Sequence, residues 1–355
     1  MKSGCASSVG LLALCTVLAC FFAFASRVAA GEKKVFILHS YELGHVCGGP
    51  QHDGALRALR EAGFEPGRNL AVQAFAMDTR RVNTTPERMR TQARLALEDI
   101  ARFSPDVLIT LDDDAFRTVG LQVANTPLPV VFSGLNGRPE SYSQQVPWLE
   151  SRNRPGHNIT GVLEKLHTLT ALKVHRKILG QLTTVYVIAD STITGAASVE
   201  QVREELQAEP NDFLWTLSVT DSWEDYQRHI RGACANPRVD LLYPLALQLK
   251  DAAGRVYTAP EILRWTTQVC RKPDLAVNYS FVEHGLMGGV GVDFEYMGWQ
   301  AGSMAARILS GESAGEMPMQ EAQRYALVFN MARVRELGIE IPQDILLAAD
   351  HVYNE

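Results

Sequence analysis

The chain has 355 residues, of which 46% are hydrophobic and 21% are charged, and its formal net charge is -6 at pH 7. This acidic balance argues against nucleic acid as a partner, because phosphates require a basic face. At about 100–200 residues per domain, the length predicts two domains, each large enough to bury its own core.

Residues 1–30 have the pattern of a signal peptide. Lys2 precedes an apolar run, Val9–Ala25, and Val28–Ala30 supplies the small residues of a cleavage site. The run is short for a membrane span, which needs about 20 apolar residues, so a membrane anchor is the weaker alternative. Anchoring as a lipoprotein is also less favoured, because Phe21 and Phe22 follow Cys20. We therefore expect a mature, periplasmic chain that begins near residue 31.

Short apolar runs alternate with amphipathic stretches, as in the β-α-β units of a parallel sheet. In the first half these segments are Val35–Leu38, Gly54–Ala62, Leu70–Phe75, Pro86–Phe103, Val107–Leu111 and Pro129–Phe132. After a polar loop at Ser141–Asn158, the second series is Thr184–Ala189, Ser198–Gln207, Phe213–Ser218, Trp223–Cys234, Val239–Tyr243, Pro260–Cys270 and Asp274–Val277. Two such halves predict an α/β fold with two doubly wound, Rossmann-like parallel-sheet lobes.

The last part of the chain exceeds what a simple second lobe needs. It holds the glycine-rich stretch Gly288–Asp293, the helical pattern Tyr296–Leu309 and the extended stretch Ala326–Asn330. We expect these segments to return to the first lobe, so that several crossings between the lobes form a hinge.

Three cysteines remain after the signal: Cys47, Cys234 and Cys270. Cys234 and Cys270 each end a helix-like segment just before an apolar strand. Such helix ends lie along one edge of a parallel sheet, so a disulfide between them is sterically feasible in an oxidising periplasm. Two unrelated thiols are the alternative.

Polar residues follow the expected strands at their carboxyl ends, where open α/β sheets bind ligands. The candidates for ligand binding are Ser40, Tyr41, Asp112, Asp113, Asp114, Gly134, Leu135, Asn136, Asp190, Ser191, Thr192, Thr194, Pro244, Asn278, Ser280 and Asp293. Their hydroxyls, amides and carboxylates suit hydrogen bonding to a small polar molecule.

Two clusters among these regions could also carry enzymatic chemistry. Asp112–Asp114 could hold a divalent metal in a transferase, but helix capping or ligand contact is the favoured interpretation. His39, His45 and His52 with Cys47 match no standard zinc spacing. The glycine-rich stretches lack the spacing of nucleotide-binding loops. We therefore expect no cofactor, no metal and no catalytic residue.

Several segments together resemble the ABC-transporter substrate-binding protein family, in the branch that includes tryptophan- and phenylalanine-binding lipoproteins. The matching segments, in family order, are 63–70, 105–109, 129–132, 156–162, 293–294 with 298–302 and 305–312, 328–332 and 337–342. His39-Ser40-Tyr41 with Asp112–Ala115 is similar to a branch of related sensory or uncharacterised binding proteins.

The resemblance implies the type I periplasmic-binding fold, with two lobes joined by three crossings. The lobes would comprise 31–161 plus 284–325 and 162–283 plus 326–355, with hinges near 160–162, 280–283 and 328–330. An amino-acid ligand would place its carboxylate at 191–194 or 133–136, and its ammonium at Asp293 or at an Asp of 112–114.

The function implied is extracytoplasmic solute binding for an ABC-type uptake system. The partners would be a small polar ligand, for which an amino acid is one candidate, and a membrane permease with a cytoplasmic ATPase. The protein itself would be monomeric and would not be an enzyme. A sensory ligand-binding protein that feeds a signalling kinase is one alternative, and a metal-dependent periplasmic transferase that uses Asp112–Asp114 is the other.

Overall fold

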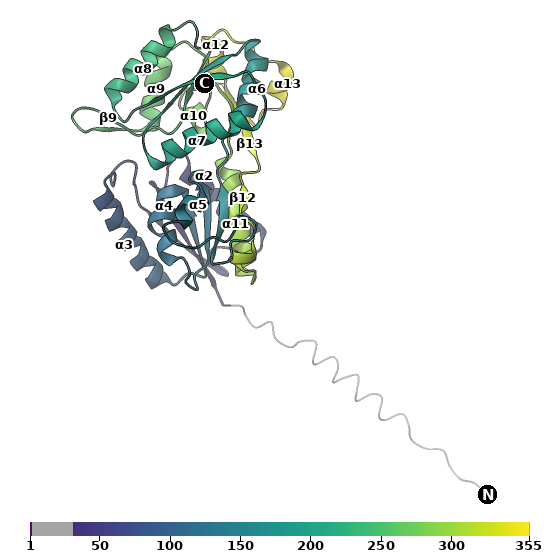
Figure 1. The fold of residues 1–355 in the computed structure, drawn as a ribbon. Helices are drawn as coiled ribbons and strands as arrows, with labels where there is room; N and C mark the ends of the chain where they lie inside the picture. Colours follow the sequence, from purple (N-terminus) through teal and green to yellow (C-terminus); the bar gives the residue numbers. More distant parts are fainter. Residues whose placement is uncertain (2–30, 355) are drawn as a thin grey trace.

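In this computed structural model the described residues are Met1 and 31–354, so the expected signal peptide lies outside the described chain. They form two α/β lobes stacked end to end (Figure 1). None of the helices described is long and apolar enough to cross a membrane.

The first lobe is built on a six-stranded, parallel sheet in the order β12-β5-β4-β3-β1-β2. Its strands are β1 (Lys33–His39), β2 (Leu70–Ala76), β3 (Val107–Leu111), β4 (Val130–Leu135), β5 (Ile159–Leu163) and β12 (Gln320–Glu321). Its helices are α2 (Gly48–Glu61), α3 (Pro86–Phe103), α4 (Asp112–Thr118), α5 (Pro139–Ser143) and α11 (Phe294–Leu309), with 3-10 turns at Gly120–Val123 and Ala314–Glu316. β1, β3 and β4 are almost wholly buried, as a parallel sheet covered on both faces requires.

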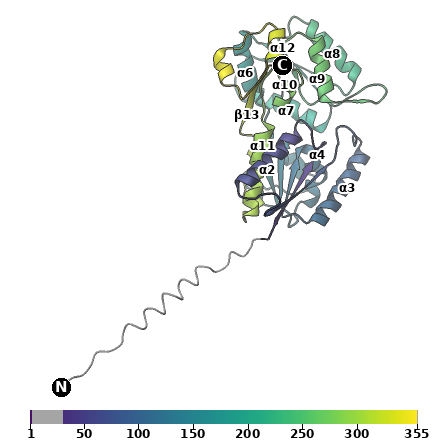
Figure 2. The same cartoon turned by 180° about the vertical axis from the view of Figure 1, so that it is seen from behind.

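Helices α2 and α11 pack closely against each other on one face of this sheet, although more than 200 residues separate them along the chain (Figure 2). Small residues make the approach possible. A Cβ added at Gly302 would lie 2.5 Å from the carbonyl oxygen of Ala55, so a larger residue would push the helices apart. This packing fixes the N-terminus of α2, which lies at the candidate site.

The second lobe contains the parallel sheet β7-β6-β8 and the mixed sheet β11-β13-β14. Bridges from residues 274–278 to both sheets connect them. Its strands are β6 (Thr184–Ala189), β7 (Leu214–Val219), β8 (Leu241–Pro244), β11 (Gly288–Val292), β13 (Tyr325–Asn330) and β14 (His351–Tyr353), with a small hairpin of β9 (Leu249–Lys250) and β10 (Val256–Tyr257). Its helices are α6 (Thr168–Leu179), α7 (Ile193–Ala208), α8 (Trp223–Ala235), α9 (Ala259–Val269), α10 (Tyr279–Glu283), α12 (Met331–Glu336) and α13 (Gln343–Leu347).

The α/β, two-lobed fold predicted from the sequence is therefore present, but the expected boundaries need correction. We expected 284–325 in the first lobe. Strand β11, however, pairs antiparallel with β13 and bridges to Leu275, so 284–292 belong to the second sheet. Likewise β5 extends the first sheet to Leu163. The three crossings fall between β5 and α6, between β11 and α11, and between β12 and β13, rather than at 160–162, 280–283 and 328–330.

A disulfide joins Cys234, at the end of α8, to Cys270, which caps α9. Their Cα atoms are 5.7 Å apart, within the usual range for this bond. It ties together two helices that cover the same face of the second sheet, where the hydroxyl groups of Tyr226 and Thr266 also share a hydrogen bond of 2.7 Å.

Candidate ligand-binding site

A cavity of about 400 Å³ lies between the two lobes and is lined by residues of both. First-lobe residues reach it from the carboxyl ends of β1, β3, β4 and β5, which the parallel sheet brings to one edge. Second-lobe residues come from the start of α7, from the segment that follows β8, from the start of α9 and from 277–281. The volume is in the range of small-molecule sites, which enclose about 300–1,000 Å³.

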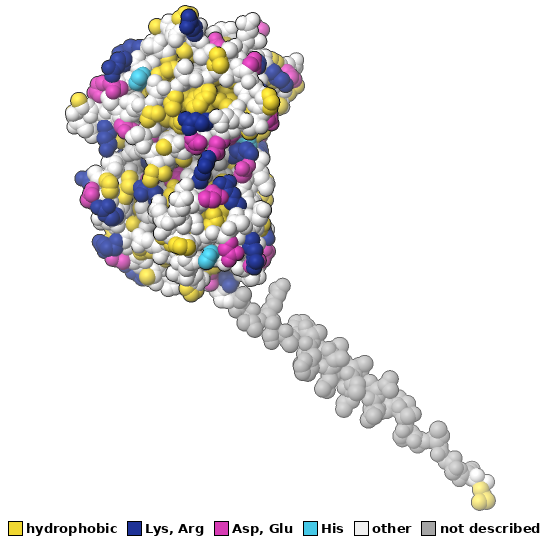
Figure 3. All heavy atoms as spheres, in the orientation of Figure 1, with side chains coloured by type: hydrophobic (Ala, Val, Ile, Leu, Met, Phe, Trp, Pro, Cys, Tyr) yellow, Lys and Arg dark blue, Asp and Glu magenta, His cyan; other side chains and the backbone are white. Residues whose placement is uncertain are grey.

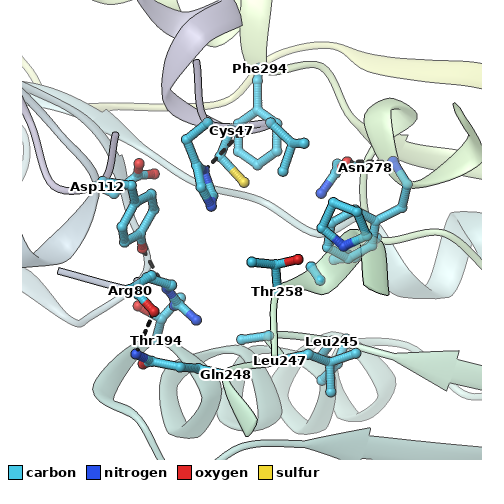
Figure 4. A pocket seen from close by; sticks show the side chains of 18 of the residues that line it. Cys47, Arg80, Asp112, Thr194, Leu245, Leu247, Gln248, Thr258, Asn278 and Phe294 are labelled. Carbon is cyan, nitrogen blue, oxygen red and sulfur yellow. Dashed lines mark hydrogen bonds between the residues drawn. The ribbon is translucent and has the colours of Figure 1, made fainter. Parts of the chain in front are cut away.

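Asp112 forms part of the first-lobe wall (Figure 4). It is 4% exposed and has the left-handed φ of 66°. Its Oδ1 accepts a hydrogen bond of 3.0 Å from Nε2 of Gln51, whereas its Oδ2 has no partner within the described residues. Burial raises the pKa of this carboxyl to about 7, with a further contribution from Asp113. An unpartnered, buried oxygen at a cavity wall is suited to a ligand donor.

Asn136 and Glu164 extend this acceptor surface along the sheet edge. Nδ2 of Asn136 donates to Oε2 of Glu164 at 3.0 Å, and Oδ1 of Asn136 is buried without a partner in the part of the chain described. Glu164 is 9% exposed, and burial together with the charge of Asp112 raises the pKa of its carboxyl well above the usual range. Three neighbouring strand ends thus present oxygen acceptors to one cavity.

Gly134 makes room for this arrangement. Its φ is 75°, and a Cβ added there would lie 2.9 Å from Oδ1 of Asp112 and 2.9 Å from Oε1 of Gln51. Gln51 also accepts from the hydroxyl of Ser133 at 2.7 Å. Glycine is therefore required on both steric and conformational grounds.

Arg80 spans the two lobes at the side of the cavity. Its guanidinium lies 3.5 Å from Oδ2 of Asp190, stacks over the ring of Tyr41 at 5.0 Å from the ring centroid, and donates to the Tyr41 hydroxyl at 3.4 Å. The Arg80 carbonyl accepts from Nε2 of Gln248 at 2.9 Å. Ser280 adds another contact between lobes by donating to the carbonyl of Val46 at 3.1 Å.

The remaining wall is largely apolar. Its apolar side chains are Leu245, Leu247, Tyr257, Val277, Phe281 and Phe294. Cys47 begins α2, and its sulfur points toward the cavity in Figure 4. Burial raises the pKa of this thiol well above its usual range, so it is a neutral thiol at pH 7 rather than a nucleophile.

The structure brings five of the sixteen sequence candidates to this cavity: Tyr41, Asp112, Asn136, Thr194 and Asn278. The other eleven do not line it. Gly134, Leu135 and Pro244 are buried, and Ser280 bonds to the first lobe. Ser40 accepts from the backbone of Ala115 and donates to that of Leu111. These residues therefore support the structure around the cavity and do not face a ligand in it.

The acidic candidates outside the cavity are occupied by protein groups. Asp113 accepts from Asn136, Gly137 and Tyr142. Asp114 accepts from Thr79 and Arg117. Asp293 caps α11 and pairs with Arg324, while Ser191 bonds to Asp221 and Thr192 caps α7. An ammonium site at Asp293 is therefore not supported by the geometry.

Asp112–Asp114 do not converge on a common point, because each has a different set of partners. Nor do the histidines and Cys47 form a metal centre: Nε2 of His39 shares a hydrogen bond of 2.9 Å with Nδ1 of His52, and Nδ1 of His45 accepts from the backbone of Cys47. Among the residues described, no group of three or more His, Cys, Asp or Glu is arranged to hold a metal ion.

Glu164, Arg80 and Gln248 are among the lining residues that the sequence did not predict. Glu164 directly follows β5, a strand hidden behind a polar loop in the sequence. Arg80 lies four residues beyond β2, and Gln248 lies beyond β8. The strand-end rule applied to β5 would have found Glu164.

Comparison with known proteins now adds to this geometry. The family model of the ABC transporter substrate binding protein matches residues 50–353. A tyrosine-binding protein of Clostridioides difficile is 18% identical over 300 residues, which cover 84% of this chain and 78% of the relative. The family resemblance read from the sequence is thereby confirmed.

Solved structures show the same fold. One is an ABC domain in complex with L-Trp from Streptococcus pneumonia, with a TM-score of 0.70, 17% identity and coverage of 91% of this chain and 100% of that chain. Another is a ligand-free, open substrate binding protein with adhesive properties from Clostridium difficile, with a TM-score of 0.65, 20% identity and coverage of 91% and 100%.

Proposed function

Because the chain belongs to the family of ABC transporter substrate-binding proteins, we propose that it captures a small molecule in the cavity between its lobes and presents it to a membrane permease outside the cytoplasm. One observation carries this proposal: the cavity is lined from both lobes, and it combines an apolar wall with buried acceptors that have no partner within residues 31–354.

The residues of the cavity wall indicate which class of ligand the cavity would hold. Asp112, Asn136 and Glu164 offer oxygen acceptors to an ammonium group, and Phe281 with Phe294 offers an apolar surface to a hydrocarbon or aromatic body. A small molecule with an ammonium group and an apolar body fits both. The relatives that bind tyrosine or tryptophan support this ligand class.

The mechanism is conformational. A ligand in contact with only one lobe would favour neither the open nor the closed form, whereas one that touches both stabilises the closed form. The contacts that Arg80, Gln248 and Ser280 make across the lobes would form as the lobes close. The closed surface is then what the permease, with its ATPase, would recognise.

A substitution that fills the cavity with a large side chain tests the proposal. Ala246 lines it, and Ala246→Trp should block binding of tryptamine, tyramine, L-tryptophan and L-tyrosine, measured by calorimetry on the chain from residue 31. Ala253→Trp, at an exposed turn after β9, is the matched control and should bind as the unaltered protein does. Equal binding by both variants would place the ligand outside the cavity and refute the proposal.

A further inference from the structure

The basic side chains on the cavity wall are already paired with acidic groups of the protein. Arg80 is paired with Asp190, whose side chain is 0% exposed. Arg81, at the mouth, is paired with Asp78 at 3.0 Å. His45 carries no charge at neutral pH, because burial and the nearby Arg80 lower its pKa to about 3, and burial also lowers the pKa of His284.

The acidic side chains on the same wall are not paired in this way. Asp112 receives one neutral donor, Gln51, and Glu164 receives another, Asn136. Within residues 31–354 neither carboxylate forms an ion pair, and Oδ2 of Asp112 has no hydrogen-bond partner. With the charges of Arg80 and Asp190 cancelling, these two carboxyl groups leave the wall with an excess of acidic groups over basic ones.

Two helix N-termini at the cavity, those of α7 and α9, could stabilise a ligand carboxylate, and both are taken by the protein's own carboxylates. At the N-terminus of α7, Asp190 accepts from the backbone and hydroxyl of Thr192, at 3.1 Å and 2.5 Å, and faces Arg80. At the N-terminus of α9, Oε2 of Glu261 accepts from both the backbone and the hydroxyl of Thr258 at 2.9 Å. Asp190 thus has the partners that an amino acid's α-carboxylate would need: a guanidinium and a helix N-terminus.

We infer that the preferred ligand is an organic amine that has an apolar body and no carboxylate, held through its ammonium by Asp112, Asn136 and Glu164. The inference rests on the proposed function and narrows its ligand class. An amine neutralises the acidic wall. A zwitterionic amino acid brings a carboxylate for which the described side chains of the wall offer no unpaired cation, and burying a carboxylate without a partner is costly.

Calorimetric titration of the chain from residue 31 tests the inference with matched probes. Tryptamine should bind at least about tenfold more tightly than L-tryptophan, a difference of about 1.4 kcal/mol. L-tryptophan amide, which keeps the ammonium and lacks the carboxylate, should behave as tryptamine does. Indole-3-propionate, which has the carboxylate alone, should not bind. Tyramine and L-tyrosine form a second pair.

The outcomes separate this inference from the proposed function. If L-tryptophan or L-tyrosine binds as tightly as its amine, the inference is overturned while the binding cavity stands. If every probe fails to bind, both are overturned.

Two variants locate the preference. Asp112→Asn should weaken tryptamine at least about tenfold, while Asp293→Asn, outside the cavity and still able to cap α11, should leave it unchanged. Asp190→Asn releases Arg80 and should shift the preference toward L-tryptophan. An unchanged preference in that variant, with its fold verified by circular dichroism, would also count against the inference.

Discussion

The guanidinium of Arg80 in the first lobe lies 3.5 Å from the carboxylate of Asp190 in the second, and both side chains are largely shielded from water. Because this ion pair joins the two lobes, closure of the lobes neutralises both charges at the cavity. It also separates the role of Asp190 from that of Asp112, which forms no ion pair within residues 31–354.

Removing this pair should open the ligand-free protein. In Arg80→Met, closure would bury Asp190 without a cation, at a cost of about 3–5 kcal/mol. We expect a larger radius of gyration in small-angle X-ray scattering and weaker ligand binding. Arg138→Met is the comparison, since Arg138 pairs across the lobes with Glu204 where both are about half exposed. Figure 3 shows Lys and Arg side chains interspersed with Asp and Glu side chains on the surface of both lobes. Such pairs contribute about 0–1 kcal/mol, so that variant should scatter as the parent does. An unaltered radius in Arg80→Met would contradict the assignment.

Ligand affinity should rise with pH between 6 and 8. Burial raises the pKa of Asp112 to about 7 and that of Glu164 well above its usual range, so protons compete with the ligand's ammonium at the lower pH. The charged and polar groups that act on Asp112 are Gln51, Arg80, Asp113, Asp114 and Glu164, together with the uncharged His39 and Cys47 near it.

Calorimetry of tryptamine in buffers of different ionisation enthalpy should reveal protons released on binding. The release should shrink in Asp112→Asn. Binding that is independent of pH over this range would show that these carboxyls do not receive the ligand.

Asp112 should destabilise the empty protein at high pH. Its pKa is higher in the folded chain than the ordinary 3.8, so the stability associated with its protonated form is lost as pH rises through about 7. Asp112→Asn keeps the contact with Gln51 and should raise the unfolding temperature at pH 8 by at least about 2 °C. The difference between the two proteins should narrow as pH falls from about 7 toward 3.8, the ordinary pKa. A variant that is less stable at pH 8 would contradict a buried, unpaired carboxylate.

Gly134→Ala should impair both folding and binding. The added Cβ would meet Asp112 and Gln51, and φ of 75° strains any residue that has a Cβ. We expect a loss of about 1–3 kcal/mol in the free energy of unfolding and weaker binding of tryptamine by calorimetry. Gly232→Ala is the control, because its Cβ would meet nothing within 4 Å and it lies inside α8, where alanine is favoured. Similar behaviour of the two variants would refute the close packing at Gly134.

The disulfide of Cys234 and Cys270 should stabilise the second lobe. Its partners are 36 residues apart, and a loop of this length corresponds to about 4 kcal/mol of lost chain entropy in the unfolded state. Reduction should lower the denaturant midpoint of the parent but not of a Cys234→Ala/Cys270→Ala variant. Thiol titration of the unfolded chain from residue 31 should give one thiol, Cys47, before reduction and three after. More than one before reduction would exclude the bond.

The fold was readable from the sequence because each strand of the parallel sheets is an apolar run with turn residues around it. Two features of the fold were not predicted from the sequence. The glycines of β11 gave no sign that this strand pairs with β13, so the crossing at Asp293 was placed too early. Helix α6 and strand β5 followed a polar loop whose composition obscured them.

For the site, position at a strand end identified Asp112, Asn136, Thr194 and Asn278. It could not separate Asp112 from Asp190 or Asp293, since all lie at such ends. What distinguishes them is whether another segment supplies a partner: Arg80 reaches Asp190 from the other lobe, and Arg324 reaches Asp293. Such contacts between residues far apart in the chain cannot be predicted from the sequence around each aspartate.

A crystal structure of the chain from residue 31 with the tightest-binding probe would test the central claim most directly. We predict density for the probe between the lobes, with its ammonium within hydrogen-bond distance of Asp112 and its apolar body against Phe281 and Phe294. Density on the outer surface of either lobe, or a probe that contacts one lobe alone while the lobes stay apart, would contradict capture in the cavity.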